Sequence, residues 1–227
     1  FPKNYIYTLE PPDNYIGSRR MIAQDGDLRE ICIRSLDDSP YNSDYVHVLP
    51  LKHKKEHELD DLPESLKDAI RVFYLSRTIQ KIRWDKDNKN DKHCTMMINA
   101  SRFVDVQDRI NDKVNEEIKK LNNSIMCESK NESTRDREII KLEEIFRKEF
   151  VDKSKVDETF DEVRNKLYDA THTIVVTQVN MRSNKKNRNE NSALDYDNGP
   201  LHVIAIGGFA LSRGLTLEGL SISYLLR

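Results

Sequence analysis

The residues best suited to bind a ligand lie in a turn between two apolar runs near the end of the sequence. The runs, Val203–Ile206 and Ile222–Leu226, have the pattern of parallel strands, and ligands of such sheets lie beyond the carboxyl ends of the strands. The candidate binding residues of the turn are Gly207, Gly208, Ser212, Arg213, Gly214 and Thr216. Paired glycines let backbone N–H groups approach a phosphate or ribose, and arginine offers phosphate a planar charged fork. The alternative, which the spacing alone favours, is a tight turn in which Arg213 pairs with a carboxylate.

A second candidate pair, Ser101 and Arg102, follows the strand-like run CTMMIN at residues 94–99. A serine and an arginine between a strand and the next helix can hydrogen-bond a phosphate. An ordinary helix cap is the alternative. Because parallel strands place their carboxyl ends on one edge of a sheet, we expect Ser101 and Arg213 to converge on one exposed rim, with the Arg213 guanidinium reachable from it.

Other motifs support no catalytic or metal site. His53-Lys54-Lys55-Glu56-His57 fits the H-x-x-E-H pattern of inverted zinc peptidases, but the segment lacks helical apolar periodicity and is interpreted as an exposed polar connection. Residues 180–199 are rich in Asn, Lys and Arg and are predicted to form a mobile loop. The sequence contains no P-loop, G-x-S-x-G elbow, H-E-x-x-H motif or paired-cysteine motif. We therefore predict no catalytic residue, no metal ligand and no cofactor of the fragment itself.

Composition limits the class of protein. Of 227 residues 33% are charged, and the net charge of −2 gives no global electrostatic case for nucleic acid, so any such binding must be local. The three cysteines, Cys32, Cys94 and Cys127, form no disulfide framework or zinc motif, and the first two alternate with apolar residues as core residues do. A reducing compartment, most simply the cytoplasm, is therefore expected, and no apolar run is long enough for a membrane. The first and last residues, Phe1 and Arg227, suggest an excised fragment of a larger protein, because the chain stops directly after an expected buried strand.

Alternating strand and helix patterns predict an α/β fold with a mainly parallel central sheet flanked by helices. The predicted strands are 29–35, 94–99, 174–179, 203–206 and 221–226. The run 203–206 is expected at the centre, beside 174–179 or 221–226. A helix from a capping-box-like Asp61 and Glu64 to about residue 84, and another over 103–121, flank the sheet. After a polar break at 122–134, helices near 139–150 and 156–167 complete an extra helical insertion at about 122–170. Residues 1–44 form an irregular arm or linker, and 45–227 one lobe.

Four stretches carry a family resemblance. The run IAIGGFALSRGLTLEGLSISYLLR at 204–227 closely resembles the signature of the Z-one domain of bacterial endonuclease-like proteins. Upstream, LPESLKDAIRVFYLSRTIQKIR, CTMMINASRFVDVQDRI and TIVVTQVN resemble its long helix, its strand with the following helix, and its penultimate strand. The resemblance covers about 45–227, and the final motif is its specific part.

That family is similar to superfamily-two helicases, which implies that this chain is a second RecA-like motor lobe, truncated at its carboxyl end. CTMMINAS then corresponds to motif IV, with Ser101 near the nucleic acid backbone. GGFALSRGLTLEGL corresponds to motif V, in which Ser212-Arg213-Gly214 links nucleic acid to the nucleotide. Thr216 replaces the usual aspartate, which leaves a direct ribose contact unsupported. Motif VI and the first lobe, with its P-loop and Mg²⁺-binding acid, would lie outside the chain.

The resemblance therefore implies a fragment of a helicase-like, nucleic-acid-dependent ATPase associated with a restriction-type endonuclease. ATP and magnesium would be cofactors of the full-length parent. Its partners would be nucleic acid, DNA in the first place, the missing first lobe, and a nuclease domain or subunit, without a membrane. The alternative is a non-catalytic interaction module of a nuclease complex, in which the Gly207-Gly208 turn is structural and the charged helices 135–151 and 156–170 dock a partner.

Overall fold

The computed structural model describes residues 16–36, 47–128, 136–153, 156–179, 194–208, 211 and 216–226. Its chain divides into two compact units, Phe1–Ser35 and Leu36–Arg227, which are described separately. Within the described ranges, none of the helices combines the length and apolar character that crossing a bilayer requires.

The smaller unit contains two short helices, α1 (Ser18–Ile22) and α2 (Arg29–Cys32). The strand predicted at 29–35 is therefore wrong. Backbone hydrogen bonds close a helical turn there, with Cys32 N donating to Leu28 O at 2.9 Å. The segment 29–35 pairs with no strand among the described residues. Cys32, which was expected in a core, is exposed.

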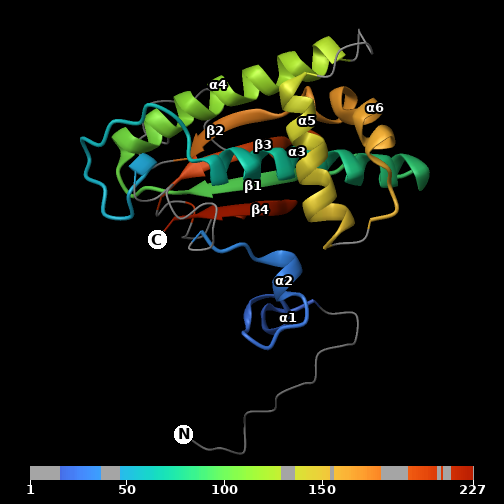
Figure 1. Ribbon diagram of the computed structural model, residues 1–227, viewed down its shortest axis with the longest axis horizontal. Coiled ribbons are helices and arrows are strands. Elements are labelled where there is room, and N and C mark those ends of the chain that lie inside the picture. Colours follow the sequence, from blue (N-terminus) through green and yellow to red (C-terminus); the bar gives the residue numbers. More distant parts are fainter. Residues whose placement is uncertain are drawn as a thin grey trace, which may run out of the picture. The chain divides into compact units, whose positions relative to one another are not determined.

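The larger unit is built on a four-stranded sheet in the order β2-β3-β1-β4, in which every pair is parallel (Figure 1). The strands are β1 (Cys94–Asn99), β2 (Val175–Val179), β3 (His202–Gly207) and β4 (Leu220–Leu225). This confirms the predicted α/β fold with a parallel sheet. It also confirms the central position of β3, which is buried along its whole length and has β2 as a neighbour.

The last strand differs from its prediction. β4 was expected to be buried, but of its residues only Tyr224 is. The strand lies at the edge of the described sheet, so its outer side lacks a neighbouring strand. Of β4, Ile222 and Tyr224 pack against the core under the helical layer, which leaves the apolar run half-covered.

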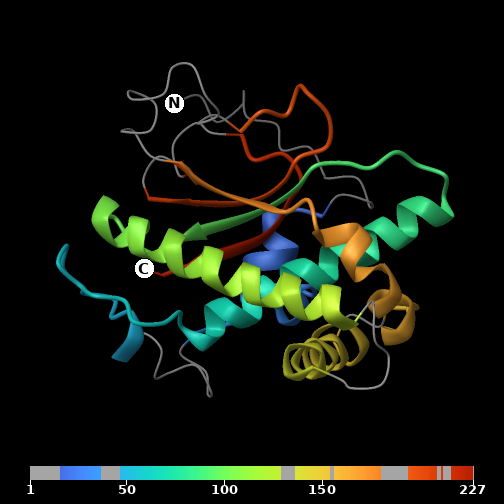
Figure 2. The same ribbon diagram turned by 90° about the horizontal axis from the view of Figure 1, so that it is seen from above.

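Two long helices, α3 (Glu64–Lys86) and α4 (Val104–Glu128), cover one face of the sheet (Figure 2). Their buried apolar residues recur at steps of three and four, which is the stripe that a helix packed on a sheet needs. The stripes pack against Met96, Ile98, Ile204 and Ile206 in one core.

The start of α3 differs from the predicted capping box. Pro63 is the N-cap residue and makes no side-chain cap, while Asp61 accepts a hydrogen bond from Leu62 N at 2.8 Å and pairs with Lys67 at 2.6 Å. Because Pro63 occupies the N-cap position, Asp61 lies outside the helix. Its carboxylate binds Leu62 N and Lys67 and does not cap the first turn.

The segment predicted as a helical insertion, and called so below, contains α5 (Arg137–Ile145), the π-helix η4 (Phe146–Val151) and α6 (Phe160–Thr171). Asp136 caps α5, and a Thr159–Glu162 capping box opens α6. The polar break predicted from residue 122 begins too early, because α4 continues to Glu128 with Ile125 buried on its core face. In Figure 1 the insertion lies towards the amino ends of the strands, away from the arrowheads.

Candidate functional site

The carboxyl edge of the sheet brings together two candidate segments that are distant in sequence. Ser101 follows β1, Gly208 follows β3, and Gln107 lies in the first turn of α4. Gln107 Nε2 donates to Ser101 O at 3.0 Å, and a Cβ at Gly208 would lie 3.0 Å from that same carbonyl oxygen. The ends of β1 and β3 therefore meet on one rim. The second polar atom of the amide, Gln107 Oε1, is buried and has no hydrogen-bond partner among the described residues.

Both glycines of the turn are tightly packed. A Cβ at Gly207 would lie 2.4 Å from Val179 O, and a Cβ at Gly208 would lie 2.7 Å from Gln107 Nε2. The contact at Gly207 is with a backbone atom, and a Cβ at Gly208 would also lie 3.0 Å from the backbone atom Ser101 O, so the glycines let the end of β3 approach its neighbours closely. This packing accounts for Gly207 and Gly208 without a ligand.

The hydroxyl of Ser101 is already engaged within the protein. Its Oγ accepts a hydrogen bond from Phe103 N at 3.1 Å and lies 2.8 Å from His53 Nε2. His53 Nδ1 lies 2.7 Å from Pro50 O, and a carbonyl can only accept, so in the neutral ring Nδ1 carries the proton. His53 Nε2 then accepts the proton of Ser101. Ser101 is thus oriented by His53 and, with the ring neutral, has no proton left to offer a phosphate.

Among the described candidate residues that follow β1 and β3, Arg102 is the one whose charge is free to bind a ligand. It is exposed, its Cζ lies 4.8 Å from the centroid of the Phe103 ring, and it has no carboxylate partner among the described residues. Thr216 is also exposed. The predicted residues Ser212, Arg213 and Gly214 lie outside the described residues, as do residues 180–193 of the predicted loop. The expected convergence of Arg213 on this rim therefore stays a prediction.

The segment from Pro50 to Glu58, interpreted from sequence as an exposed connection, is anchored on α4. Arg109 Nη1 donates to Lys55 O at 3.2 Å and to His57 O at 3.1 Å, and Lys55 Nζ lies 3.2 Å from Asp105 Oδ2. His57 Nε2 lies 2.8 Å from Val48 O. In Figures 1 and 2 this segment, drawn in cyan, lies on the side to which the strand arrowheads point.

His53 is the site residue that sequence reasoning missed. The H-x-x-E-H spacing drew attention to it as a zinc ligand, whereas both of its ring nitrogens contact protein groups. Across the described residues no group of three or more potential metal-ligating side chains is assembled. The signal that could have found its role is a histidine in a polar segment directly before a helix that packs on the strand ends.

A buried polar network lies at the opposite, amino-terminal edge of the sheet. Arg77 Nη2 donates to Asp91 Oδ2 at 2.5 Å, and His202 Nδ1 lies 2.7 Å from Thr173 Oγ1. Burial and the positive charge of Arg77 lower the pKa of His202. These groups lie at the amino ends of the strands and form no part of the rim that holds Ser101.

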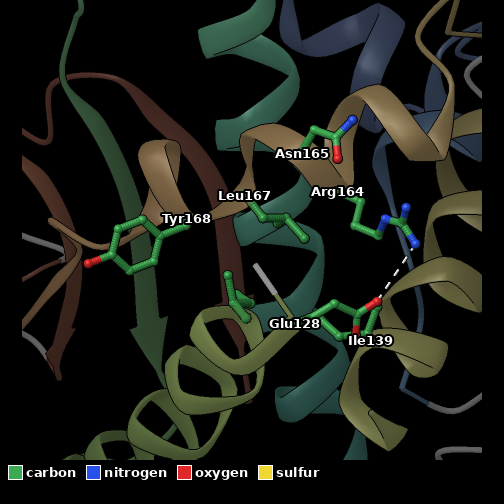
Figure 3. Close-up of a pocket in the computed structure, with 7 residues that line it drawn as sticks. Glu128, Ile139, Arg164, Asn165, Leu167 and Tyr168 are labelled. Carbon is green, nitrogen blue, oxygen red and sulfur yellow. Dashed lines mark ion pairs between the residues drawn. The ribbon is translucent and has the colours of Figure 1, made fainter. Parts of the chain in front are cut away.

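A cavity of about 130 Å³ lies in the helical insertion, at the far end of α4 (Figure 3). Its lining residues are Ile125, Glu128, Ile139, Arg164, Asn165, Leu167 and Tyr168. The charges of Glu128 and Arg164 face each other across 3.8 Å and neutralise each other. This cavity is separate from the carboxyl edge and offers no uncompensated charge to a ligand.

Comparison with known proteins gives one match. A model of the Z1 domain family matches residues 65–227. No curated protein and no solved structure matches the chain. The matched region contains β1, β3 and the turn between β3 and β4, and begins after the segment that carries His53.

Proposed function

This chain belongs to the Z1 domain family, and we propose that it forms the second, nucleic-acid-binding lobe of a cytoplasmic helicase-like ATPase that acts with a restriction-type endonuclease. The observation that carries the proposal is the meeting of Ser101 and Gly208 at the carboxyl edge, with the unpaired Arg102 beside them. Ligands of parallel α/β sheets bind beyond this edge.

Within this proposal, Arg102 is the main phosphate contact of the described residues. Its guanidinium is exposed and uncompensated, and its planar fork fits phosphate oxygens. Ser101 is not a phosphate donor in this proposal, because its hydroxyl is engaged by His53. It fixes the backbone directly before Arg102. Arg213 adds the contact between nucleic acid and nucleotide that the small-Arg-Gly pattern implies. Closure of two lobes around a nucleotide would then move the nucleic acid contacts on this one.

ATP and magnesium belong to the full-length parent in this proposal. Among the described residues no group of three or more His, Cys, Asp or Glu is assembled, and the resemblance places the Mg²⁺-binding acid in the first lobe. The magnesium ligands are therefore assigned to the first lobe, and no residue of this chain is given a step that involves the ion.

The test measures nucleic-acid-stimulated ATP hydrolysis by the full-length parent with Arg102→Ala or Arg213→Ala. We expect both variants to lose most of the stimulation while the urea midpoint of the protein stays within error. The purified 227-residue chain is expected to hydrolyse no ATP. Lys119→Ala is the matched control, because Lys119 is exposed, has no carboxylate partner among the described residues and lies towards the far end of α4. Undiminished stimulation in both arginine variants would contradict the proposal.

The alternative function is a non-catalytic interaction module of a nuclease complex. The close packing of Gly207 and Gly208 favours it, because these glycines are then needed for the fold alone. The sequence that follows Arg227 in the parent gene separates the two functions. A segment with the Gln and Arg residues of motif VI supports the motor, and its absence supports the module.

A further inference from the structure

The anchored segment at residues 50–58 carries two lysines whose charge is uncompensated. Most lysines of the described chain have a carboxylate partner, as Lys55 has in Asp105. Lys52 and Lys54 are both exposed and have no such partner among the described residues. Two charged groups without an internal partner, in a segment held in place by other contacts, are available to an external anion.

The anchoring places these lysines beside the candidate site. His53, which stands between them, contacts Ser101 Oγ at 2.8 Å, and Ser101 directly precedes Arg102. Two nearby carboxylates are occupied, because Asp105 pairs with Lys55 and Glu58 lies 3.5 Å from Arg109, while Glu56 of the same segment is exposed and offsets part of its positive charge. The edge therefore presents three uncompensated cations that come from two segments distant in sequence, Lys52 and Lys54 from one and Arg102 from the other.

We propose that the segment 52–55 is the second half of a phosphate-binding surface at the carboxyl edge, and that Lys52 and Lys54 contact successive backbone phosphates of a single-stranded nucleic acid. This inference rests on the proposed function. Charges spread over two segments suit an extended polyanion better than one nucleotide. Lysine contacts phosphate as a point charge on a flexible stem, so these contacts add affinity without sequence preference. His53 is a positioning residue, since it ties the lysine segment to the end of β1.

The test measures binding of a labelled oligo(dT) by the full chain at a series of salt concentrations. We compare Lys52→Ala/Lys54→Ala with the control Lys92→Ala/Lys119→Ala. The control removes the same charge from two exposed lysines that also lack carboxylate partners among the described residues. Each lost phosphate contact lowers the slope of log affinity against log salt by roughly 0.7 for a single strand. We therefore expect the slope of the first variant to fall by about 1.4, and that of the control to stay unchanged.

The outcomes separate this inference from the function on which it rests. If the wild-type chain binds no oligo(dT), the proposed function fails. If it binds, and Arg102→Ala weakens binding while Lys52→Ala/Lys54→Ala behaves as the control, the function stands and this inference is overturned. A parallel titration with ATP identifies the source of the phosphate, because a loss seen with ATP but not with oligo(dT) also overturns it. His53→Ala keeps both lysines but breaks the contact of their segment with Ser101, so it should weaken oligo(dT) binding and lower the salt slope. Unchanged affinity and slope would show that His53 does not position the lysines.

Discussion

Two clusters of charged side chains lie along α4, one beside its first turn and one beside its middle, and they are built differently. Beside its first turn stand Arg102, Lys52 and Lys54, which are exposed and have no carboxylate partners among the described residues. Further along, Arg71 of α3 is 1% exposed and enclosed by carboxylates. Both clusters are cationic at their centres, so the presence of charge does not distinguish them.

The buried cluster compensates its own charge. Arg71 Nη2 lies 3.0 Å from Glu117 Oε1 and 2.8 Å from Glu138 Oε2, and Arg71 Nη1 donates to Asp68 at 3.1 Å. Lys120 approaches the other oxygen of Glu138 at 3.0 Å. Because these residues come from α3, α4 and α5, the cluster attaches the helical insertion to the helical layer.

A charged side chain can bind a ligand when it lacks an oppositely charged partner within the protein. The number of charges around it does not decide this. A buried ion cluster holds elements together and is sensitive to the loss of any member, because the remaining charges stay desolvated. Exposed, unpaired cations add little to stability and remain free for a polyanion. The chain has a charged fraction of 33%, and many of the charged side chains in the described ranges belong to internal pairs.

The largest effect is expected from Arg71→Ala. The change leaves Glu117 and Glu138 buried without their main cation, so it should lower the free energy of unfolding by roughly 3–5 kcal/mol. Lys113→Ala is the control, since Lys113 forms an i,i+3 pair with Glu116 at 2.9 Å near the surface and its loss should shift the unfolding midpoint only slightly. Urea unfolding measures both. Equal midpoints for the two variants would show that the cluster is not a structural centre.

The second-largest effect on stability is expected from acid, which should break the ion pairs of the buried cluster. Burial alone would raise the pKa of Glu138, but hydrogen bonds from Arg71 and Lys120 and their charges lower it to about 2, from 4.5. Since the folded pKa lies below the unfolded one, Glu138 stabilises the fold above pH 4.5, and this contribution, about 3 kcal/mol at most, is lost as the pH falls towards 2. Glu138→Gln should flatten this part of the pH dependence. Parallel stability curves for wild type and variant between these pH values would refute the assignment.

The turn at the carboxyl edge should show an intermediate effect. Gly208→Ala places a Cβ 2.7 Å from Gln107 Nε2, which should cost roughly 1–3 kcal/mol of stability. In a Gln107→Ala background the nearest contact is removed, so the same substitution should cost less. A double-mutant cycle by urea unfolding measures this coupling. Strict additivity would mean that Gln107 is not the group that requires glycine at this position.

The smallest change in stability is expected from Arg102→Ala. The side chain is exposed and unpaired, so the free energy of unfolding should stay within about 0.5 kcal/mol of wild type. Binding of oligo(dT) should weaken in the same variant. Arg71→Ala should show the opposite pattern. It should lower the free energy of unfolding, while Arg71 itself makes no contact with the nucleic acid. A cost for Arg102→Ala comparable to that of Gly208→Ala would place Arg102 among the structural residues.

Local pattern determined most of the fold. The runs at 94–99, 174–179 and 203–206 and the apolar stripes of α3 and α4 were readable because burial on one or two faces imposes a period on the sequence. The alternation at 29–35 misled, since a four-residue helix and a strand can share so short a pattern. The burial of β4 was also misjudged, because an apolar run does not state how many neighbours the strand has.

The site depended more on tertiary structure. Sequence alone singled out Ser101, Arg102 and the Gly207-Gly208 turn as strand-end residues, because the carboxyl ends of parallel strands share an edge. It could not show that His53 contacts the Ser101 hydroxyl, or that Gly208 packs against Gln107, since these contacts join segments that the chain separates by many residues. Which cations are compensated was likewise decided by folding. The sequence specifies how many charges of each sign exist, and only packing determines which of them meet.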